Sequence, residues 1–394
     1  MKIAINTTSA VAGGGVTYIK NLLPYLSKIN TTHQYLILTT LAGKEAFYFQ
    51  HPNFKFVSFE TPSRSSILRI LWEQFFLPSF LKKERVDILF SPGNICPLFT
   101  KLPNVVMIQN IEPFSNVLQK RRGLMQRIRL RLLKLLTILS VKKAQRVIFP
   151  SKKAGILTNT LIKHAKVIYH GINKEMFHLH IENTILYQFK KKYSLDKFIL
   201  YVSNVQRYKN FLELIKAFIL LKGKIDDTIQ LVFAGKCFDK KYYDEMLALI
   251  VAHGYENRII FLGNVPYEEL PYLYSACTLF VFPSTCESFG MTLVEAMACG
   301  APVLASNIEP MPEICANAAI YFDPTNPAEI SNTIFRVLED RGLISTLRKN
   351  ALQRIKIFSW ENTAINTLKV LEAVTLTRTN QKECKKGEKK KGRK

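Results

Sequence analysis

The chain has 394 residues, more than one ordinary hydrophobic core supports, so two domains are expected. Its composition, 48% apolar and 11% aromatic, is that of a folded protein with large cores and excludes an intrinsically disordered chain. The formal net charge of +25 predicts attraction to a polyanion, such as an anionic membrane, a nucleic acid or phosphorylated small molecules.

Several other classes of protein are disfavoured by local sequence. The most apolar stretches, such as Leu132–Val141, are short and interrupted by Lys134, so no membrane-spanning segment is expected. The start MKIAINTT has the pattern of a strand, and no secretory signal is predicted. The seven cysteines are scattered without any C-x-x-C pair, which predicts thiols in a reducing cytoplasm and neither a disulfide framework nor a zinc site.

Short β-branched and aromatic runs alternate with helical patterns along the first half of the chain. After a strand at Lys2–Ile5 come a glycine loop, Gly13–Gly15, and a helix over Val16–Leu26. A second helix is predicted over Ile67–Lys83, with Trp72 and Phe75 in its apolar stripe. The other strands of this half are predicted at Tyr35–Thr39, Phe54–Phe59, Val86–Phe90, Val105–Gln109, Val147–Phe149 and Lys166–Tyr169.

The same alternation starts again after a polar interval at residues 174–197. Its helices are predicted at Leu212–Leu221, Tyr242–His253 and Met291–Cys299, the last ending at Gly300 as a left-handed cap. Its strands are predicted at Phe198–Val202, Gln230–Ala234, Ile259–Phe261, Leu279–Phe282 and Val303–Ala305. Two such series predict an α/β fold with two doubly wound parallel sheets, which bind ligands at the carboxyl ends of their strands.

Two glutamates, Glu287 and Glu295, lie eight residues apart in the stretch CESFGMTLVEAMACGAPVLAS. The amides of Gly290, Met291 and Thr292 open the predicted helix and are suited to bind a phosphate. Glu295 lies one turn further into this helix, where it is placed to accept hydrogen bonds from a ribose diol. Glu287, on the loop before the helix, is placed to accept hydrogen bonds from the hydroxyls of a sugar. The structural alternatives are a buried salt bridge at Glu295 and a solvated loop charge at Glu287.

The stretch from Glu287 to Val303 resembles the E-x7-E signature of retaining glycosyltransferases of family 4, also called group 1. The resemblance covers nearly the whole chain except its tail. Tyr201–Phe211 resembles the first strand and turn of the family's second domain, and Arg258–Gly263 with Val265 resembles the segment beside the base pocket. Ile168–Asn173 resembles the hinge between the domains, and Phe358–Trp360 resembles the start of the final helix. The family has the GT-B fold, in which two Rossmann-like domains face each other across a cleft.

This resemblance implies a domain organisation. Residues 1–170 are expected to form the N-terminal, acceptor-side domain, and residues 171–357 the C-terminal domain that binds the nucleotide sugar. Residues 358–373 are expected to form a final helix that crosses back to the first domain. Residues 374–394 carry nine basic residues and no apolar periodicity, which predicts a disordered basic tail.

The resemblance also implies roles for single residues. Glu295 would hold the ribose, Glu287 the hydroxyls of the transferred sugar, and Lys209 would neutralise the diphosphate as its charge grows. The family often has an arginine where this chain has Asn204 or Tyr208, so the second cationic role is carried to Arg207. Further donor-binding residues are expected to be Ser288, Phe289, Gly290, Met291, Thr292 and Val265.

The first domain contributes a glycine loop and an amide side chain. Gly14 and Gly15 match the family's loop near the diphosphate and the acceptor, although a glycine triplet is as readily a flexible turn. The family commonly has a histidine after the strand that ends near Ile108; here Gln109 and Asn110 follow, which donate hydrogen bonds but cannot act as charged acids. No Asp-x-Asp motif occurs, so neither a metal nor another cofactor is expected.

A basic segment lies between Glu112 and Glu175, where fifteen residues are Lys or Arg and none is acidic. It includes residues 119–143, whose apolar residues recur at helical spacing: Leu124, Ile128, Leu132, Leu135, Leu136 and Leu139. A basic amphipathic helix suits an anionic membrane surface, and the alternative is a core helix with a solvated charged face. No nucleic-acid partner is expected, because nothing here resembles a recognition module.

The sequence therefore predicts a retaining, metal-independent glycosyltransferase that moves a hexose from a nucleoside-diphosphate sugar to a lipid-linked or surface-polysaccharide precursor. Its expected place is the cytoplasm, peripheral to the inner face of the membrane. Two other GT-B enzymes are disfavoured: an epimerase by the E-x7-E stretch, and a phosphorylase by the lack of a pyridoxal-phosphate lysine context. The alternative class is a catalytically silent GT-B protein that binds a glycan or scaffolds a partner.

Overall fold

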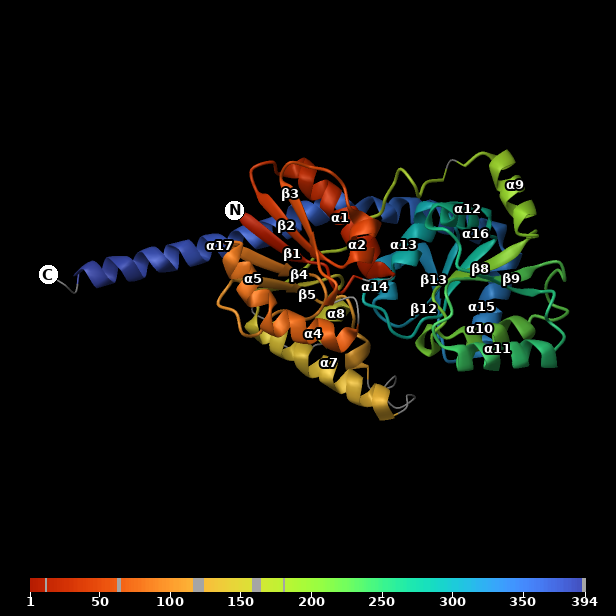
Figure 1. Ribbon diagram of the computed structural model, residues 1–394. Coiled ribbons are helices and arrows are strands. Elements are labelled where there is room, and N and C mark those ends of the chain that lie inside the picture. The colour runs from red at the N-terminus through yellow and green to blue at the C-terminus, as the bar shows by residue number, and fades with distance from the viewer. Residues whose placement is uncertain (11–12, 62–64, 116–123, 158–163, 180, 392–394) are drawn as a thin grey trace. The chain divides into compact units, whose positions relative to one another are not determined.

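The computed structural model describes residues 1–10, 13–61, 65–115, 124–157, 164–179 and 181–391. The chain divides into two compact units, one made of Met1–Gly171 with Trp360–Lys394 and the other of Ile172–Ser359. Each unit is built on its own parallel sheet with flanking helices (Figure 1). This confirms the predicted pair of doubly wound α/β sheets.

The first unit contains a seven-stranded sheet of order β3-β2-β1-β4-β5-β6-β7, in which all neighbours pair in parallel. Its strands are β1 (Lys2–Asn6), β2 (Gln34–Thr39), β3 (Phe54–Ser58), β4 (Ile88–Ser91), β5 (Asn104–Met107), β6 (Arg146–Phe149) and β7 (Ala165–Val167). Its helices are α1 (Gly14–Ile29), α2 (Leu41–Phe47), α4 (Ser66–Phe75), α5 (Leu77–Lys83), α7 (Leu124–Lys143), α8 (Lys152–Leu157) and α17 (Trp360–Lys391). A short 3₁₀ helix, η1, lies at Glu112–Phe114.

The second unit contains a six-stranded sheet of order β10-β9-β8-β11-β12-β13, again wholly parallel. Its strands are β8 (Phe198–Val202), β9 (Gln230–Ala234), β10 (Ile259–Gly263), β11 (Leu279–Phe282), β12 (Val303–Ser306) and β13 (Ala319–Phe322). Its α-helices are α9 (Asn183–Lys192), α10 (Phe211–Ile219), α11 (Lys240–Ala252), α12 (Leu270–Ala276), α13 (Met291–Ala298), α14 (Met311–Cys315), α15 (Pro327–Glu339) and α16 (Arg341–Arg354). The 3₁₀ helices of this unit are η2 (Arg207–Lys209), η3 (Tyr267–Glu269), η4 (Ala316–Ala318) and η5 (Ile355–Ile357).

The last helix, α17, belongs to the first unit and packs against α1. Its buried residues Trp360, Ala364, Leu368 and Leu371 recur at helical spacing and form one apolar stripe. The sequence prediction ended this helix at residue 373, but the structure continues it to Lys391. Lys, which is common in this segment, is a good helix former, as are Glu and Gln, and propensity explains the added length where apolar periodicity is missing.

The helix predicted over Ile67–Lys83 is divided into α4 and α5 at Phe76. Pro78 lies in the first turn of α5, where a proline is tolerated but cannot continue the preceding helix. Trp72 packs into the core as expected, whereas Phe75 is 62% exposed and lies outside the buried stripe. Trp72 and Phe75, predicted in one apolar stripe, therefore lie on different faces of α4, one buried and the other exposed.

Both sheets reverse their strand order beside their first strand, between β1 and β4 and between β8 and β11. Loops that leave two such neighbouring strands diverge to opposite sides and leave room for a ligand at the carboxyl edge. In the second unit these loops carry Lys209, after β8, and Glu287, after β11. The topology alone therefore brings these two predicted residues to one end of the sheet.

Candidate functional site

Lys209 is held at the end of the turn that follows β8. The hydroxyl of Tyr201 donates a hydrogen bond of 2.9 Å to the Lys209 carbonyl. Asn210 follows in the left-handed conformation, with φ 63°, and its side-chain amide donates to the Pro324 carbonyl. These contacts fix the backbone on both sides of Lys209, so that its ammonium group approaches the site from a defined position.

The ammonium group of Lys209 forms an ion pair with Glu287, with Nζ 2.5 Å from Oε1. Both side chains are largely buried, with 14% and 13% of their surfaces exposed. Burial by itself lowers the pKa of Lys209, but the nearby Glu287 and Tyr208 outweigh it and raise the pKa above the usual value. Lys209 therefore stays positively charged throughout the physiological range.

The loop that carries Glu287 is tied to the turn that carries Lys209. The backbone amide of Thr285 and its hydroxyl both donate to the carbonyl of Tyr208, at 2.9 and 3.0 Å. Two loops from neighbouring strands thus form one unit at the switch point of the sheet, and the predicted pair of Lys209 and Glu287 is brought into direct contact.

Helix α13 begins immediately after this loop with an N-terminal turn that no side chain caps. Its N-cap residue is Gly290, which has φ 90°. A Cβ at this position would lie 3.0 Å from Leu293 Cδ1, so both the backbone angle and the space favour glycine. The amides of Met291 and Thr292 belong to the first turn, whose N–H groups have no partner within the helix. The C-terminal end is also as predicted, with Gly300 in the left-handed cap position at φ 72°.

Ser288 and Phe289 lie between Glu287 and this helix. The ring of Phe289 is 1% exposed and packs edge-on against Phe358, with ring centroids 5.7 Å apart. The Phe289 side chain therefore stabilises the loop from inside, and only its backbone can take part in the site. Ser288 is half-buried.

Glu295 is 3% exposed and lies one turn into α13. Tyr274 donates a hydrogen bond of 2.9 Å to one carboxylate oxygen, and Tyr267 donates one of 3.3 Å to the other. Within the described part of the chain Glu295 has no Lys or Arg partner, so the alternative of a buried salt bridge is wrong. Burial raises the pKa of Glu295 to about 7, although both tyrosine hydrogen bonds lower it.

The sequence analysis did not predict either tyrosine as a partner of Glu295. Tyr267 opens η3 and packs against Phe177, with ring centroids 5.4 Å apart, while Tyr274 is fully buried in α12. Their hydroxyls orient the Glu295 carboxylate, which has about four lone-pair positions and keeps some of them for a ligand. Tyr267 follows Val265, itself 8% exposed, so the predicted base-side segment contributes to the site through the residues after β10.

Arg207 was predicted to share the phosphate-binding role with Lys209. Its guanidinium group instead forms two hydrogen bonds with Glu245, at 2.7 and 2.9 Å, and lies 3.5 Å from Asp239. It also stacks over the ring of Tyr242 at 4.9 Å. These contacts engage Arg207 with α11 and its N-cap, and they do not support the phosphate role.

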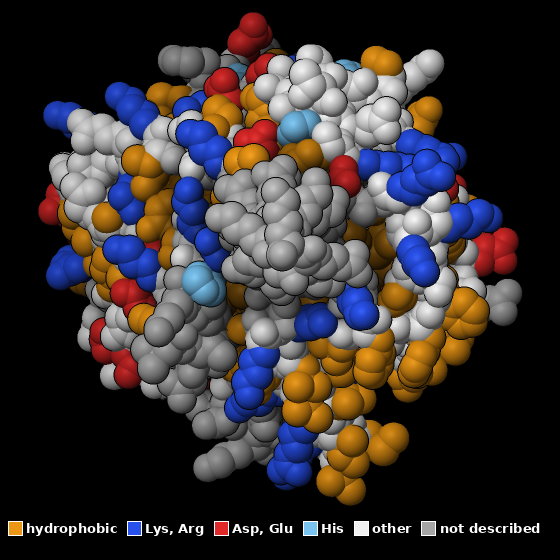
Figure 2. All heavy atoms as spheres, turned by 90° about the vertical axis from the view of Figure 1, so that its left-hand side faces the viewer, with side chains coloured by type: hydrophobic (Ala, Val, Ile, Leu, Met, Phe, Trp, Pro, Cys, Tyr) orange, Lys and Arg blue, Asp and Glu red, His pale blue; other side chains and the backbone are white. Residues whose placement is uncertain are grey.

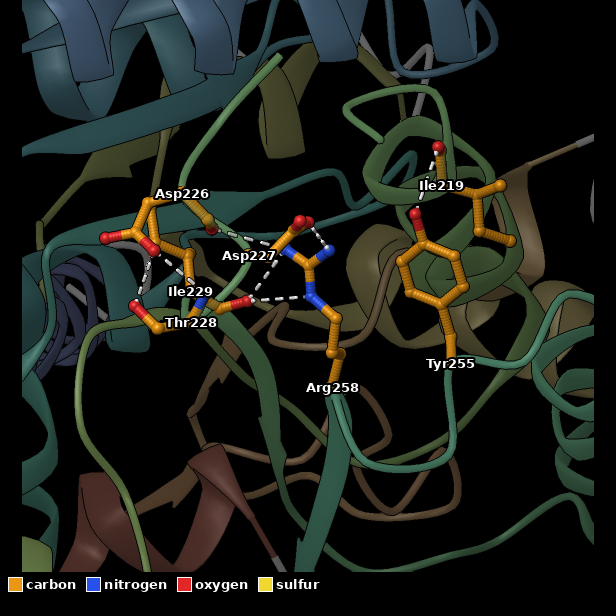
Figure 3. A network of polar contacts seen from close by, with 7 residues as sticks. All are labelled: Ile219, Asp226, Asp227, Thr228, Ile229, Tyr255 and Arg258. Carbon is orange, nitrogen blue, oxygen red and sulfur yellow. Dashed lines mark hydrogen bonds and ion pairs between the residues drawn. The ribbon is translucent and has the colours of Figure 1, made fainter. Parts of the chain in front are cut away.

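Arg258 occurs in the segment that resembles the base-pocket lining, but it lies before β10, at the amino edge of the sheet. Figure 3 shows its guanidinium group directed at the loop that leads into β9. It donates to Asp227 at 2.8 Å and to the Ile229 carbonyl at 3.2 Å. Arg258 therefore anchors this loop, and only the carboxyl end of β10 can contribute to a ligand site.

In the first unit, Gly15 and Gln109 are brought together at the carboxyl edge of the sheet. A Cβ added to Gly15 would lie 4.0 Å from Gln109 Oε1, whereas one added to Gly14 would meet no atom within 4 Å. Asn94, in the loop after β4, accepts hydrogen bonds of 2.9 Å from the amides of both Gln109 and Asn110. Asn94 is a residue that the sequence analysis missed, and it fixes the backbone beside Gln109.

Two family descriptions match the chain, one for each half. "Glycosyl transferases group 1" matches residues 184–354, and "Glycosyltransferase Family 4" matches residues 12–176. Among curated relatives, the O-antigen chain mannosyltransferase B of Escherichia coli is 35% identical over 181 residues, which are 45% of this chain and 47% of the relative. The D-inositol 3-phosphate glycosyltransferase of Salinispora arenicola is 33% identical over 127 residues, which are 32% of this chain and 28% of the relative.

Solved structures resemble the chain over almost its whole length. Sucrose-phosphate synthase from Thermosynechococcus elongatus has a TM-score of 0.77 at 17% identity and covers 96% of this chain and 100% of its own. The Anabaena protein HepE, in complex with UDP and glucose, has a TM-score of 0.75 at 21% identity, with 95% and 100% covered. At these identities the likeness shows the fold. The curated relatives are matched over about half of their length or less.

Proposed function

The chain belongs to the group 1 glycosyltransferases of GT-B fold, and we propose that it transfers a sugar from a nucleoside-diphosphate sugar to a hydroxyl acceptor with retention of the anomeric configuration. The observation that carries this proposal is the cluster at the switch point of the second sheet, where Lys209, Glu287 and the first turn of α13 lie together. A donor of this class offers an anion to the cation and the amides, and hydroxyl groups to the carboxylates.

In the proposed complex, Glu295 accepts hydrogen bonds from the two ribose hydroxyls while Tyr274 and Tyr267 hold its carboxylate. The diphosphate lies between Lys209 and the first amides of α13, where the helix dipole favours negative charge. Because the diphosphate competes with Glu287 for the Lys209 ammonium group, donor binding releases the Glu287 carboxylate. Glu287 then accepts hydrogen bonds from the hydroxyls of the sugar.

The proposed reaction breaks the bond between the anomeric carbon and the diphosphate oxygen, and the electron pair stays on that oxygen. The acceptor hydroxyl approaches the same face of the sugar; its oxygen forms the new bond to the anomeric carbon, and its proton passes to the departing diphosphate oxygen. Lys209 and the helix amides are fixed donors aimed at the charge that grows on the leaving group. This arrangement supplies the charge stabilisation from the chain itself, so we propose a reaction without a metal or another cofactor.

The transfer proposal is tested with a panel of UDP-, GDP- and ADP-sugars, with release of the nucleoside diphosphate as the readout. We expect one donor class to be hydrolysed slowly without acceptor, and we expect the rate to be unchanged by a chelator. A rate that the chelator abolishes and added metal restores would contradict the metal-free reaction. No turnover of any donor would favour the alternative of a catalytically silent GT-B protein.

For the acceptor we propose a lipid-linked or surface-polysaccharide precursor on the cytoplasmic face of a membrane. The name of the Escherichia coli relative, an O-antigen chain mannosyltransferase, supports a glycan acceptor. Helix α7 supports the membrane: five of the six residues of its predicted apolar stripe are between 38% and 71% exposed, namely Leu124, Ile128, Leu132, Leu135 and Leu139, and Leu136 is half-buried. Of the predicted segment 119–143, residues 119–123 lie outside the described part of the chain.

Vesicle flotation tests the proposed membrane partner. The protein is expected to float with vesicles that contain phosphatidylglycerol and to bind more weakly as salt is raised, because salt screens the Arg and Lys side chains of α7. Vesicles of phosphatidylcholine alone serve as the control. Absence of binding to the anionic vesicles at low salt would contradict the proposal.

Within the described residues, no helix has the length and apolar character needed to cross a bilayer.

A further inference from the structure

A second apolar surface of the first unit lies on α4, outside the basic segment. Ile67, Leu71 and Phe75 follow each other at intervals of one helical turn and are 70%, 47% and 62% exposed. The opposite face of the same helix is buried, with Trp72 in the core. Large apolar side chains that gather on one exposed helix face indicate a binding surface, in contrast to single scattered ones.

The loop after β4 joins this surface to α7. The side-chain amide of Gln74, on α4, donates to the Cys96 carbonyl at 3.1 Å and accepts from the Leu98 amide at 2.8 Å. The amide of Cys96 in turn donates to the hydroxyl of Ser140, on α7, at 3.1 Å. Both helices are thus bonded to the same short stretch of backbone.

Phe75 of α4 and Phe99, in the loop after β4, form an exposed aromatic pair. Phe99 is 72% exposed, and its ring stacks on that of Phe75, with centroids 6.1 Å apart and an angle of 18° between the planes. We call the exposed residues of α4 together with Phe99 the α4 patch. In Figure 2, hydrophobic side chains lie at the lower end of the drawn face, with Lys and Arg side chains among them.

The exposed charges of α4, α5 and α7 are of one sign. Helix α7 carries six basic residues and no acidic one. Helices α4 and α5 contain a single acid, Glu73, which is 3% exposed and accepts hydrogen bonds from Asn6 and Thr8. An apolar surface on helices whose exposed charges are cations complements an anionic bilayer, in which apolar side chains enter the interface and cations contact the lipid headgroups.

The α4 patch is also close in the chain to the predicted acceptor side. The loop after β4 leads from Asn94, which holds the backbone of Gln109, to Phe99. This length of chain spans at most about 18 Å even when fully extended. A membrane at Phe99 would therefore lie near the carboxyl edge of the first sheet, where an acceptor attached to a lipid can reach it.

We propose that the α4 patch inserts into an anionic bilayer while the cations of α7 contact its headgroups, so that the carboxyl edge of the first sheet faces lipid-linked acceptors. The inference rests on the proposed function for the identity of the acceptor. It adds a distinct apolar part to the membrane contact, made by Phe75, Phe99, Ile67 and Leu71. This part differs from the charge contact because salt does not weaken it.

The test compares wild type with the double variant Phe75→Ser/Phe99→Ser on vesicles of phosphatidylglycerol and phosphatidylcholine. At about 0.5 M NaCl, where charges are screened, the double variant is expected to lose about tenfold or more in vesicle affinity. It is also expected to raise the surface pressure of an anionic lipid monolayer less than wild type does. The matched control is Phe238→Ser/Phe335→Ser, which removes two phenylalanines of the second unit that are 55% and 37% exposed.

Equal vesicle binding by wild type and the Phe75/Phe99 variant at high salt would overturn the inference, as would an equal loss in the control. Self-association of wild type without lipid, abolished in the Phe75/Phe99 variant, would overturn it in favour of a second copy of the chain. Donor hydrolysis without vesicles is measured in parallel and is expected to be unchanged in this variant. If wild type turns over a donor but shows no salt-resistant binding, only the inference fails; if it binds vesicles but turns over no donor, only the proposed function fails.

Discussion

Replacing Lys209 by alanine is expected to lower kcat for sugar transfer by about a hundredfold or more. The ammonium group of Lys209 is held at the carboxyl edge of the second sheet, 2.5 Å from Glu287. Negative charge grows on the diphosphate as the glycosidic bond breaks, so a fixed cation stabilises the transition state more than the bound donor. The Michaelis constant for the donor is therefore expected to change less than kcat, in steady-state assays over a range of donor concentrations.

The matched control is Arg207→Ala, which removes a neighbouring cation from the same turn. Its guanidinium group is paired with Glu245 and lies over Tyr242, so this variant is expected to keep kcat within about threefold of wild type. Melting temperatures of both variants show whether either one is unfolded. Equal losses of kcat in the two variants, with both still folded, would contradict the assignment of the diphosphate to Lys209.

Replacing Glu295 by glutamine is expected to weaken the binding of nucleoside diphosphates by about tenfold or more at pH 8. Glutamine has the same shape as the protonated carboxyl group but offers no negative charge to a ribose diol. In wild type the affinity is expected to rise between about pH 6 and pH 8, because Glu295 becomes ionised around its pKa of about 7. The variant should lack this rise, and calorimetric titration at several pH values measures both effects.

The same substitution is expected to stabilise the fold. The pKa of Glu295 is raised from 4.5 to about 7, so between these values the folded state binds a proton that the unfolded state has lost. Stability from this group is therefore present at low pH and is lost as pH rises through about 7. At pH 8 the buried negative charge costs about 3 kcal/mol, which Glu295→Gln removes.

Thermal unfolding at about pH 5 and pH 8 measures this difference. The variant should melt at a higher temperature than wild type at pH 8, and the two should converge at pH 5. A variant that is less stable than wild type at both pH values would show that Tyr267 and Tyr274 hold an ionised carboxylate by preference. It would also contradict the view that Glu295 is kept at the cost of stability because the donor needs its charge.

Much of the second unit could be predicted from the sequence, because its signals are local. Gly290 and Gly300 bound a run of good helix formers, and α13 begins and ends at these glycines. The spacing of Glu287 and Glu295 then places one carboxylate on the loop and the other inside the helix. Strand order follows the usual rule for doubly wound sheets, so Lys209 and Glu287 were predictable as neighbours.

What could not be predicted depends on contacts between distant segments. The partners of Glu295 are hydroxyl groups of Tyr267 and Tyr274, which only the fold brings to α13. The pairing of Arg207 with Glu245 likewise needs α11 to be placed beside the turn. Without these positions, a cation near Lys209 in sequence is indistinguishable from one that faces the diphosphate.

The faces of α4 and α7 show the same limit in the first unit. Periodicity identifies an amphipathic helix but does not say whether its apolar stripe is covered by the core. In α7, Leu132 of the predicted stripe is 49% exposed, whereas Leu130, which lies outside that stripe, is buried. In α4 the buried Trp72 and the exposed Phe75 lie only three residues apart in one short helix.

The most direct test of the proposed donor site is calorimetric titration of UDP, GDP and ADP into wild type and Glu295→Gln at about pH 8. We expect one of these nucleotides to bind wild type at a single site and to bind the variant at least about tenfold more weakly. Binding of equal strength to both proteins, or no binding of any nucleoside diphosphate to wild type, would contradict it.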